Sequence, residues 1–292
     1  MMLRSFALAL LCLLGLAAAP AEAAKFQSQR LTVEVHGKGP DVVLIPGLSS
    51  SPRVWDTTMA AIPGYRYHVV RVAGFDGTAP AANGSGPVVE PVAEEIARYI
   101  RESRLKKPAV IGHSLGGTWA MLVSARHPDL VSKAMVVDMM PFLGAMFGPP
   151  GATSESVKPV AEQIRQAIAG ADADRRKTMT EQTIATMVKT ESLRPAIVAQ
   201  SLASDAKVSG QAYYDLVLLD LRPELGKIKV PLSVLWVKPP TVPLTEEQMA
   251  GYYKLSYANA PQAAVKNIPD SYHFIMFDQP EAFQAEVRNF LK

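Results

Sequence analysis

The stretch VIGHSLGGTWA, residues 110–120, places Ser114 in a Gly-x-Ser-x-Gly pattern. An apolar run precedes the serine and a helical pattern follows it, which predicts a sharp strand-to-helix turn. Such a turn lifts the hydroxyl above the edge of a sheet and points the amino end of the next helix at it, where developing negative charge is stabilised. The pattern predicts that Ser114 is a nucleophile. The alternative is a glycine-rich turn that carries an exposed serine.

A serine hydroxyl needs a general base, and the chain has five histidines. His273 lies in NIPDSYHFIMF, after the last strand-like run and before the last helical pattern, so its loop is expected at the carboxyl edge of a sheet. The other histidines are expected in strands, beside the serine or at a helix end: His36, His68, His113 and His127. His273 is therefore the candidate base.

A second loop, LIPGLSSSPRVWD at residues 44–56, follows another apolar run. Gly47 allows the chain to turn tightly beside the nucleophile. The backbone N–H of Leu48 would then join the N–H of Leu115 as an oxyanion hole. A simple turn at the end of a strand would use the same residues.

Apolar runs and helical patterns alternate along the chain, which favours a three-layer α/β fold with a mostly parallel sheet. The first run alternates like a strand of a half-exposed hairpin, and the others are continuously apolar. The strand-like runs are 31–35, 41–45, 67–72, 108–113, 133–138, 232–237 and 263–268. The helical patterns between them are 88–104, 115–127, 245–259 and 280–291.

Residues 141–225 break this alternation and predict a helical cap or lid inserted into the core formed by 24–140 and 226–292. Three amphipathic segments in the insertion indicate short helices, with Gly170 and Gly210 near helix ends. The segment PFLGAMFGPP, residues 141–150, is apolar enough to favour a hydrophobic substrate, although packing alone would select the same residues.

The first 23 residues have the pattern of a cleavable secretory signal. Arg4 precedes an apolar run over 6–19, and the small residues AEA end the segment before Ala24. The run is shorter than a membrane span requires. We therefore expect a periplasmic or secreted protein. Cys12 is the only cysteine, so cleavage would leave a chain with no disulfide and no thiolate metal site.

Composition narrows the possible partners. The 292 residues carry a net charge of only +3, with no long basic run, which argues against nucleic acid. No segment after the signal is long and apolar enough to cross a membrane. No metal-binding spacing occurs, and no cofactor is expected.

Together these motifs resemble the α/β-hydrolase family. IPGLSSSPRVW is similar to the oxyanion loop, GHSLGG to the nucleophile elbow, and SYHFIMFDQPEAF to the histidine loop and last helix. The resemblance extends from Lys25 to Lys292 and is weakest over the insertion. One departure is Pro46-Gly47, where members often have His-Gly. The other is Lys238 and two prolines, where members usually carry the triad acid.

Some members carry that acid one strand earlier, and the resemblance places Asp138 there, at the end of KAMVVD. A strand-end aspartate that caps loop amides is the alternative for Asp138. Other carboxylates are less suitably placed along the chain: Asp76, Glu246, Glu247, Asp270 and Asp278. Of these, Asp270 is the main rival, because it lies three residues before His273.

The resemblance implies a serine hydrolase that cleaves an ester or related acyl bond of a small, apolar substrate through an acyl-enzyme. Amide and carbon–carbon hydrolysis and perhydrolysis use the same machinery and stay open. The alternative from another class is a catalytically weak binding protein that keeps the fold but lacks the usual acid.

Overall fold

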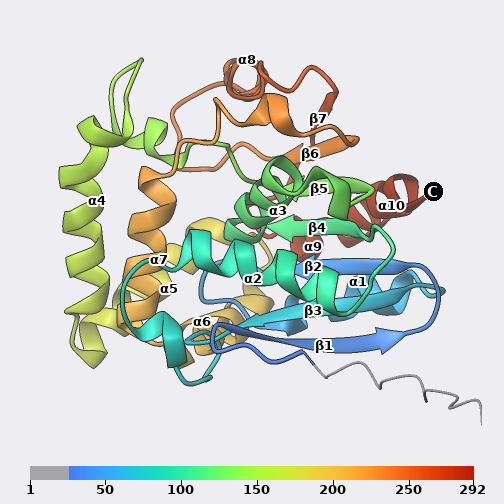
Figure 1. Cartoon of the computed structure of the whole chain (residues 1–292). Helices are drawn as coiled ribbons and strands as arrows, with labels where there is room; N and C mark the ends of the chain where they lie inside the picture. Colours follow the sequence, from blue (N-terminus) through green and yellow to red (C-terminus); the bar gives the residue numbers. More distant parts are fainter. Residues whose placement is uncertain (1–25) are drawn as a thin grey trace, which may run out of the picture.

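The computed structural model describes residues 26–292, so the expected signal segment lies outside the described residues. At its centre is one seven-stranded sheet in the order β1-β3-β2-β4-β5-β6-β7 (Figure 1). The strands are β1 (Leu31–Gly37), β2 (Asp41–Ile45), β3 (Arg66–Val72), β4 (Ala109–His113), β5 (Lys133–Val137), β6 (Leu232–Trp236) and β7 (Ala263–Asn267). All seven predicted strands are confirmed. All neighbours are parallel except β1, which runs antiparallel to β3.

The hairpin expected for the first strand is wrong. β1 does not pair with β2, because β2 already has β3 on one side and β4 on the other. The free side of β3 accepts β1 instead, in a register that sets Leu31 opposite Val72. β1 is the edge strand. Thr32 is exposed on its outer face, as the alternating pattern predicted. On the opposite, apolar face Leu31 is buried, but Val35 is 53% exposed.

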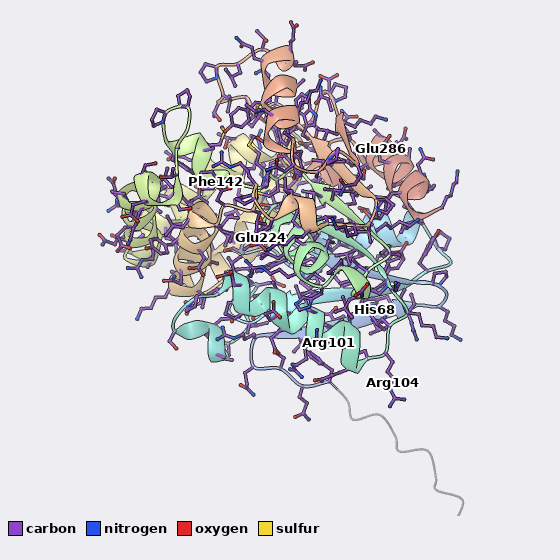
Figure 2. The ribbon with its side chains drawn as sticks, turned by 45° about the horizontal axis from the view of Figure 1, so that its top comes forward. His68, Arg101, Arg104, Phe142, Glu224 and Glu286 are labelled. Carbon is purple, nitrogen blue, oxygen red and sulfur yellow. The ribbon has the colours of Figure 1, made fainter. Side chains whose placement is uncertain are left out.

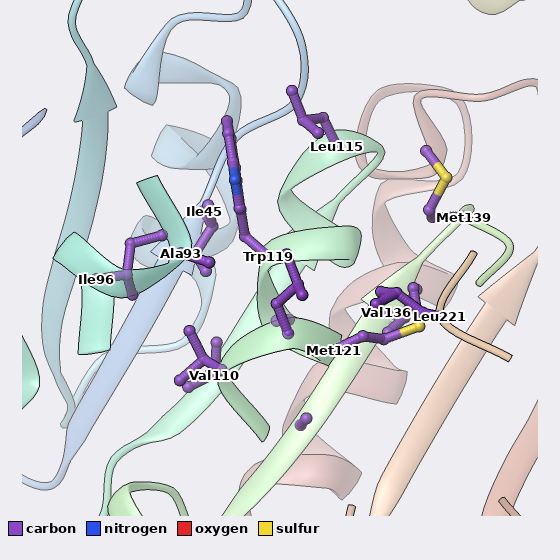
Figure 3. Packing of buried hydrophobic residues seen from close by; sticks show 14 of the residues in the cluster. Ile45, Ala93, Ile96, Val110, Leu115, Trp119, Met121, Val136, Met139 and Leu221 are labelled. Atoms are coloured by element: carbon purple, nitrogen blue, oxygen red, sulfur yellow. The ribbon is translucent and has the colours of Figure 1, made fainter. Parts of the chain in front are cut away.

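Helices cover both faces of the sheet because successive strand residues point to opposite sides. One face packs against α2 (Val89–Glu102), α3 (Leu115–Arg126) and α8 (Glu246–Ser256). The other packs against α1 (Asp56–Ala61), α9 (Ile275–Asp278) and α10 (Pro280–Leu291). In Figure 3, Met121 of α3 faces Val136 and Leu221, and all three are buried in one cluster with Trp119, which is also on α3. The indole N–H of Trp119 donates to the carbonyl of Val89 at 2.8 Å, so the ring is buried without an unpaired donor.

Four helices fill the predicted insertion between β5 and β6: α4 (Ser154–Ala169), α5 (Ala173–Met187), α6 (Arg194–Ala203) and α7 (Ala206–Leu218). In Figure 1 they lie at the left, beyond the carboxyl ends of the parallel strands. Phe142, labelled in Figure 2, is buried with Val157 of α4 and Val217 of α7, which joins the insertion to the end of β5.

The sequence indicated α4, α5 and α6 but not α7, and it misplaced one glycine. Gly170 ends α4, as expected. Gly210 was expected near a helix end but lies within α7. A Cβ at that position would be 2.9 Å from the carbonyl oxygen of Arg165, so the glycine is required by the close approach of α4 rather than by a turn.

Among residues 26–292, no helix combines the length and the apolar character needed to cross a bilayer.

Candidate active site

Ser114 lies between β4 and α3 in a backbone conformation that few residues adopt. Its φ is 55° and its ψ is −126°. Such strain persists only where the surroundings enforce it. Here the serine N–H donates to the carbonyl of Val137 at 2.9 Å. A Cβ on Gly112 would be 1.9 Å from the carbonyl oxygen of Gly116, so only a glycine permits this turn.

The loop after β2 passes directly beside this turn. A Cβ on Gly47 would lie 2.9 Å from the Cβ of Ser114. A Cβ on Gly116 would be 2.1 Å from the carbonyl oxygen of Ile45, so the amino end of α3 also abuts β2. Leu115 is the first residue of α3, where a backbone N–H has no acceptor within the helix. Leu48 and Ser114 both line the same cavity. The structure therefore brings the two predicted oxyanion-hole residues to the nucleophile turn.

The structure also brings together Asp138 and His273, which are 135 residues apart. The Oδ2 atom of Asp138 lies 2.6 Å from Nδ1 of His273. The aspartate side chain is 6% exposed and the histidine 19% exposed. Because Nδ1 faces a carboxylate, it carries the proton, which leaves Nε2 as the free acceptor of the ring.

The other carboxylate oxygen of Asp138 is held by the residue that follows β6 and by α8. Its Oδ1 atom accepts the backbone N–H of Val237 at 3.1 Å and the hydroxyl of Tyr253 at 3.0 Å. A buried carboxylate is costly unless hydrogen bonds satisfy it, and these two bonds provide that compensation. Asp138 therefore makes both contacts that the sequence left open, one to the histidine and one to a loop amide.

Sequence reasoning missed Tyr253, because one tyrosine in a helical pattern carries no signal of a contact 115 residues away. Its ring stacks on Trp236 with centroids 5.1 Å apart. Burial, followed by the charge of Asp138, raises the pKa of Tyr253 well above its ordinary value, so the hydroxyl stays protonated and donates.

His113 is buried behind Ser114 and stays neutral. Its Nε2 atom is 3.0 Å from the carbonyl oxygen of His273, to which it donates. The Nδ1 atom has no hydrogen-bond partner among the described residues. Burial, followed by repulsion from His273, lowers the pKa of His113 well below 6.5. This neutral ring supports the backbone of the candidate base.

The rival carboxylates have other partners. Asp270 is 82% exposed and lies 3.4 Å from Nζ of Lys189. Asp278 accepts backbone N–H groups of Lys189, Thr190 and Tyr272 and so ties the histidine loop to the insertion. Glu246 and Glu247 occupy the first turn of α8. Asp76 pairs with Arg71. None of these five carboxylates is bonded to His273 in the part of the chain that the structure describes.

A cavity of about 460 Å³ opens over these residues, between the carboxyl ends of the strands and the insertion. Its floor includes Ser114, Asp138 and His273. Most of its wall is apolar, with side chains from α4, α5, α7 and α8: Ile164, Ile168, Met179, Met187, Leu216 and Met249. The size and lining suit a small apolar ligand. Within residues 26–292, no cluster of metal-ligating side chains is found.

Comparison with known proteins gives one family. Residues 42–286 match the model of the alpha/beta hydrolase family. Among curated proteins, the pimeloyl-[acyl-carrier protein] methyl ester esterase of Vibrio atlanticus is 28% identical over 218 residues, which cover 72% of this chain and 80% of that protein. The enzyme of the same name from Vibrio vulnificus is 33% identical over 113 residues, 38% of this chain and 42% of that protein.

Solved structures give the same fold. An esterase from Exiguobacterium antarcticum superposes with a TM-score of 0.73 at 21% identity, over 90% of this chain and 97% of that one. This likeness confirms the predicted fold class, a mostly parallel sheet flanked by helices with a helical insertion.

Proposed function

The chain belongs to the alpha/beta hydrolase family, and we propose that it hydrolyses carboxylic esters of small, apolar acids through Ser114, His273 and Asp138. The observation that carries the proposal is the 2.6 Å contact between Asp138 and Nδ1 of His273, on the floor of the cavity that also exposes Ser114. The two curated relatives, both methyl ester esterases by name, support the bond type.

In this mechanism the hydroxyl oxygen of Ser114 attacks the ester carbonyl carbon while its proton passes to Nε2 of His273. Asp138 stabilises the imidazolium that forms. The backbone N–H groups of Leu48 and Leu115 donate to the oxyanion. His273 then returns the proton to the departing alcohol. Water, deprotonated by the same ring, hydrolyses the acyl-enzyme and frees the acid.

The binding-protein alternative rested on the missing carboxylate after β6. Asp138 fills that gap in the hydrogen-bond network from the neighbouring strand, which supports the enzyme proposal over a catalytically weak relative. No cofactor and no metal enters any step.

A fluorophosphonate probe tests the proposal because it labels only an activated serine. We expect labelling of the purified protein at Ser114, together with hydrolysis of p-nitrophenyl esters. Ser114→Ala should lose both, with residual turnover of about a thousandfold over water from the oxyanion hole. The exposed Ser85→Ala serves as the matched control. Unchanged turnover in Ser114→Ala would refute the assignment.

We further propose that residues 1–23 direct export to the periplasm or the medium and are removed before Ala24. The pattern of Arg4, the apolar run and the small residues at 21–23 supports this proposal. Amino-terminal sequencing of the protein recovered from the periplasm of a bacterial host should begin at or near Ala24. A soluble cytoplasmic product that keeps Met1 would contradict it.

A further inference from the structure

The loop that carries Leu48, residues 46–51, is fixed only weakly by bonds within itself. We call this segment the oxyanion loop. The N–H of Ser50 donates to the carbonyl of Gly47 at 3.3 Å, and the hydroxyl of Ser50 donates to the carbonyl of Leu48 at 3.3 Å. Both distances are longer than those of well-formed hydrogen bonds. Other contacts must therefore hold the loop in place.

Ser49 shows where those contacts act. Its backbone φ is 53°, in the left-handed region that serine seldom adopts. Such a conformation persists only where the surroundings enforce it. Leu48 lies between this residue and Gly47, which packs against the turn of Ser114. The direction of the Leu48 peptide is thus set from one side by the nucleophile turn and from the other by whatever holds Ser49.

Two hydrogen bonds from the insertion hold that side of the loop. The Oγ atom of Ser49 lies 2.7 Å from Oγ of Ser209 on α7, and both side chains are buried. The N–H of Ser51 donates to Oε1 of Gln200 on α6 at 2.7 Å. Both are short enough to be well formed. Pairing also compensates the two hydroxyls for the loss of water.

The turn between α6 and α7 is itself fixed to the core. The N–H of Asp205 donates to the carbonyl of Gly74 at 2.7 Å, and the N–H of Asp76 donates to Oγ of Ser204 at 2.9 Å. The guanidinium of Arg176 on α5 donates to the carbonyl of Ser204. The two side chains that hold the oxyanion loop flank this turn, so they act from a fixed base.

The donor beside these contacts is available to a substrate. Among residues 26–292, the N–H of Leu48 is bonded to no acceptor. Leu48 is half-buried and lines the cavity together with Ser114. An oxyanion hole is effective because its donors are already aimed before the negative charge develops. The contribution of this N–H therefore depends on how firmly its loop is held.

We propose that Ser209 and Gln200 are positioning residues of the oxyanion hole. They hold the loop beyond Leu48, so that its N–H stays directed at the oxyanion. This inference rests on the proposed ester hydrolysis and gives the insertion a part in the reaction beyond covering the cavity. An oxyanion-hole donor stabilises the transition state more than the bound ester. Loss of either bond should therefore lower kcat and leave KM nearly unchanged.

Steady-state hydrolysis of a p-nitrophenyl ester by the full protein tests the proposal, with circular dichroism to confirm folding. Ser209→Ala and Gln200→Met each remove one bond. Each should lower kcat about 10-fold with KM within about twofold, and the double variant should approach the loss of about 10²- to 10³-fold expected for a whole donor. Ser201→Ala is the matched control. Its side chain also lines the cavity but has no hydrogen bond to the oxyanion loop in the described structure, so both constants should stay native.

Two inhibitors with the same acyl chain separate the aim of the donor from the shape of the cavity. In a trifluoromethyl ketone, the hydroxyl oxygen of Ser114 bonds to the carbonyl carbon, its proton passes to His273, and the ketone oxygen becomes an oxyanion. The matching N-methylamide binds without reacting. In Ser209→Ala, the inhibition constant of the ketone should rise about as much as kcat falls, while that of the amide stays constant. If both inhibition constants rise equally together with KM, the hydroxyl only shapes the cavity and the inference is overturned.

The remaining outcomes are also decisive. Native kcat in both Ser209→Ala and Gln200→Met overturns the inference and leaves the proposed function intact. Because Ser209 is buried and Gln200 is half-buried, Gln200→Met provides an independent test if Ser209→Ala does not fold. A native protein that hydrolyses no ester refutes the proposed function, and the inference falls with it.

Discussion

Replacing Asp138 by asparagine changes the candidate active site at one atom. The amide oxygen of the new side chain retains the acceptor for the N–H of Val237 and the hydroxyl of Tyr253, which both bond to Oδ1 in the native protein. The amide nitrogen then faces His273 in place of Oδ2. Because that nitrogen donates, Nδ1 of the histidine must become an acceptor and the ring proton moves to Nε2. The base would then face Ser114 with a proton already in place.

The size of the effect follows from that geometry. The wrong tautomer removes general base catalysis, and the imidazolium that forms during the reaction loses its carboxylate. In serine proteases the same exchange lowers turnover by about 10⁴, and we expect a loss of that order here. It corresponds to about 5 kcal/mol of transition-state stabilisation. The fold should survive, since the two structural bonds to Oδ1 are kept.

Turnover of a p-nitrophenyl ester, measured at one pH with circular dichroism to confirm folding, tests this expectation. Asp270→Asn is the matched control, since its side chain is 82% exposed and paired with Lys189. It should cost about tenfold or less, as should Glu246→Gln. If Asp270→Asn is the crippled variant and Asp138→Asn is mild, the acid assignment is wrong. If all three variants stay active, the protein works with a serine and histidine alone.

Three further outcomes are expected. Tyr253→Phe removes a hydrogen bond to the buried Asp138 carboxylate and should lower the free energy of unfolding by about 1.5–3 kcal/mol in urea titrations. Its loss of turnover should be smaller than that of Asp138→Asn. Equal stability of Tyr253→Phe and the native protein would contradict this role. Because the pKa of His113 is lowered below 6.5 in the folded protein, the unfolded chain binds the proton more tightly, so its contribution to stability is fully present above pH 6.5 and is lost as the pH falls. The urea midpoint of the native protein should be lower at about pH 5.5 than at about pH 7.5, and the difference should be smaller in His113→Gln. An equal difference in both proteins would refute the role of His113 in this loss of stability. Gly116→Ala should destabilise the fold by about 1–3 kcal/mol or more, because the new Cβ meets a backbone oxygen, whereas Gly251→Ala, in open space on α8, should stabilise it by up to about 1 kcal/mol; thermal melting of both variants checks the contrast.

The sequence predicted the strands and most helices well, because local residue patterns determine them. It predicted contacts between distant side chains only where a motif links those residues. All seven strands appear as apolar runs, and the turn at Ser114 follows from its flanking glycines. The partner of β1 was mispredicted, because an alternating pattern specifies which face of a strand is buried and not which neighbour it meets.

The candidate site shows the same division. Ser114 and His273 are found by pattern and chain order, and Asp138 by resemblance to a minority arrangement. Tyr253 could not be found in this way, because its significance depends on which carboxylate it reaches after folding. α7 was missed because Gly210 looked like a helix end, while tight packing on α4 makes a glycine compatible with its interior.

The bond from Val237 to Asp138 has a consequence for how this region tolerates change. Where the acid follows β6, the residue at that strand end must be a carboxylate, and every other residue type is a loss. Here the residue after β6 contributes only a main-chain N–H, which every amino acid except proline supplies. The two prolines, Pro239 and Pro240, begin just beyond the last amide that is needed. The side chains after β6 therefore take no part in the proposed reaction. The segment that follows can vary in length and composition without removing the acid.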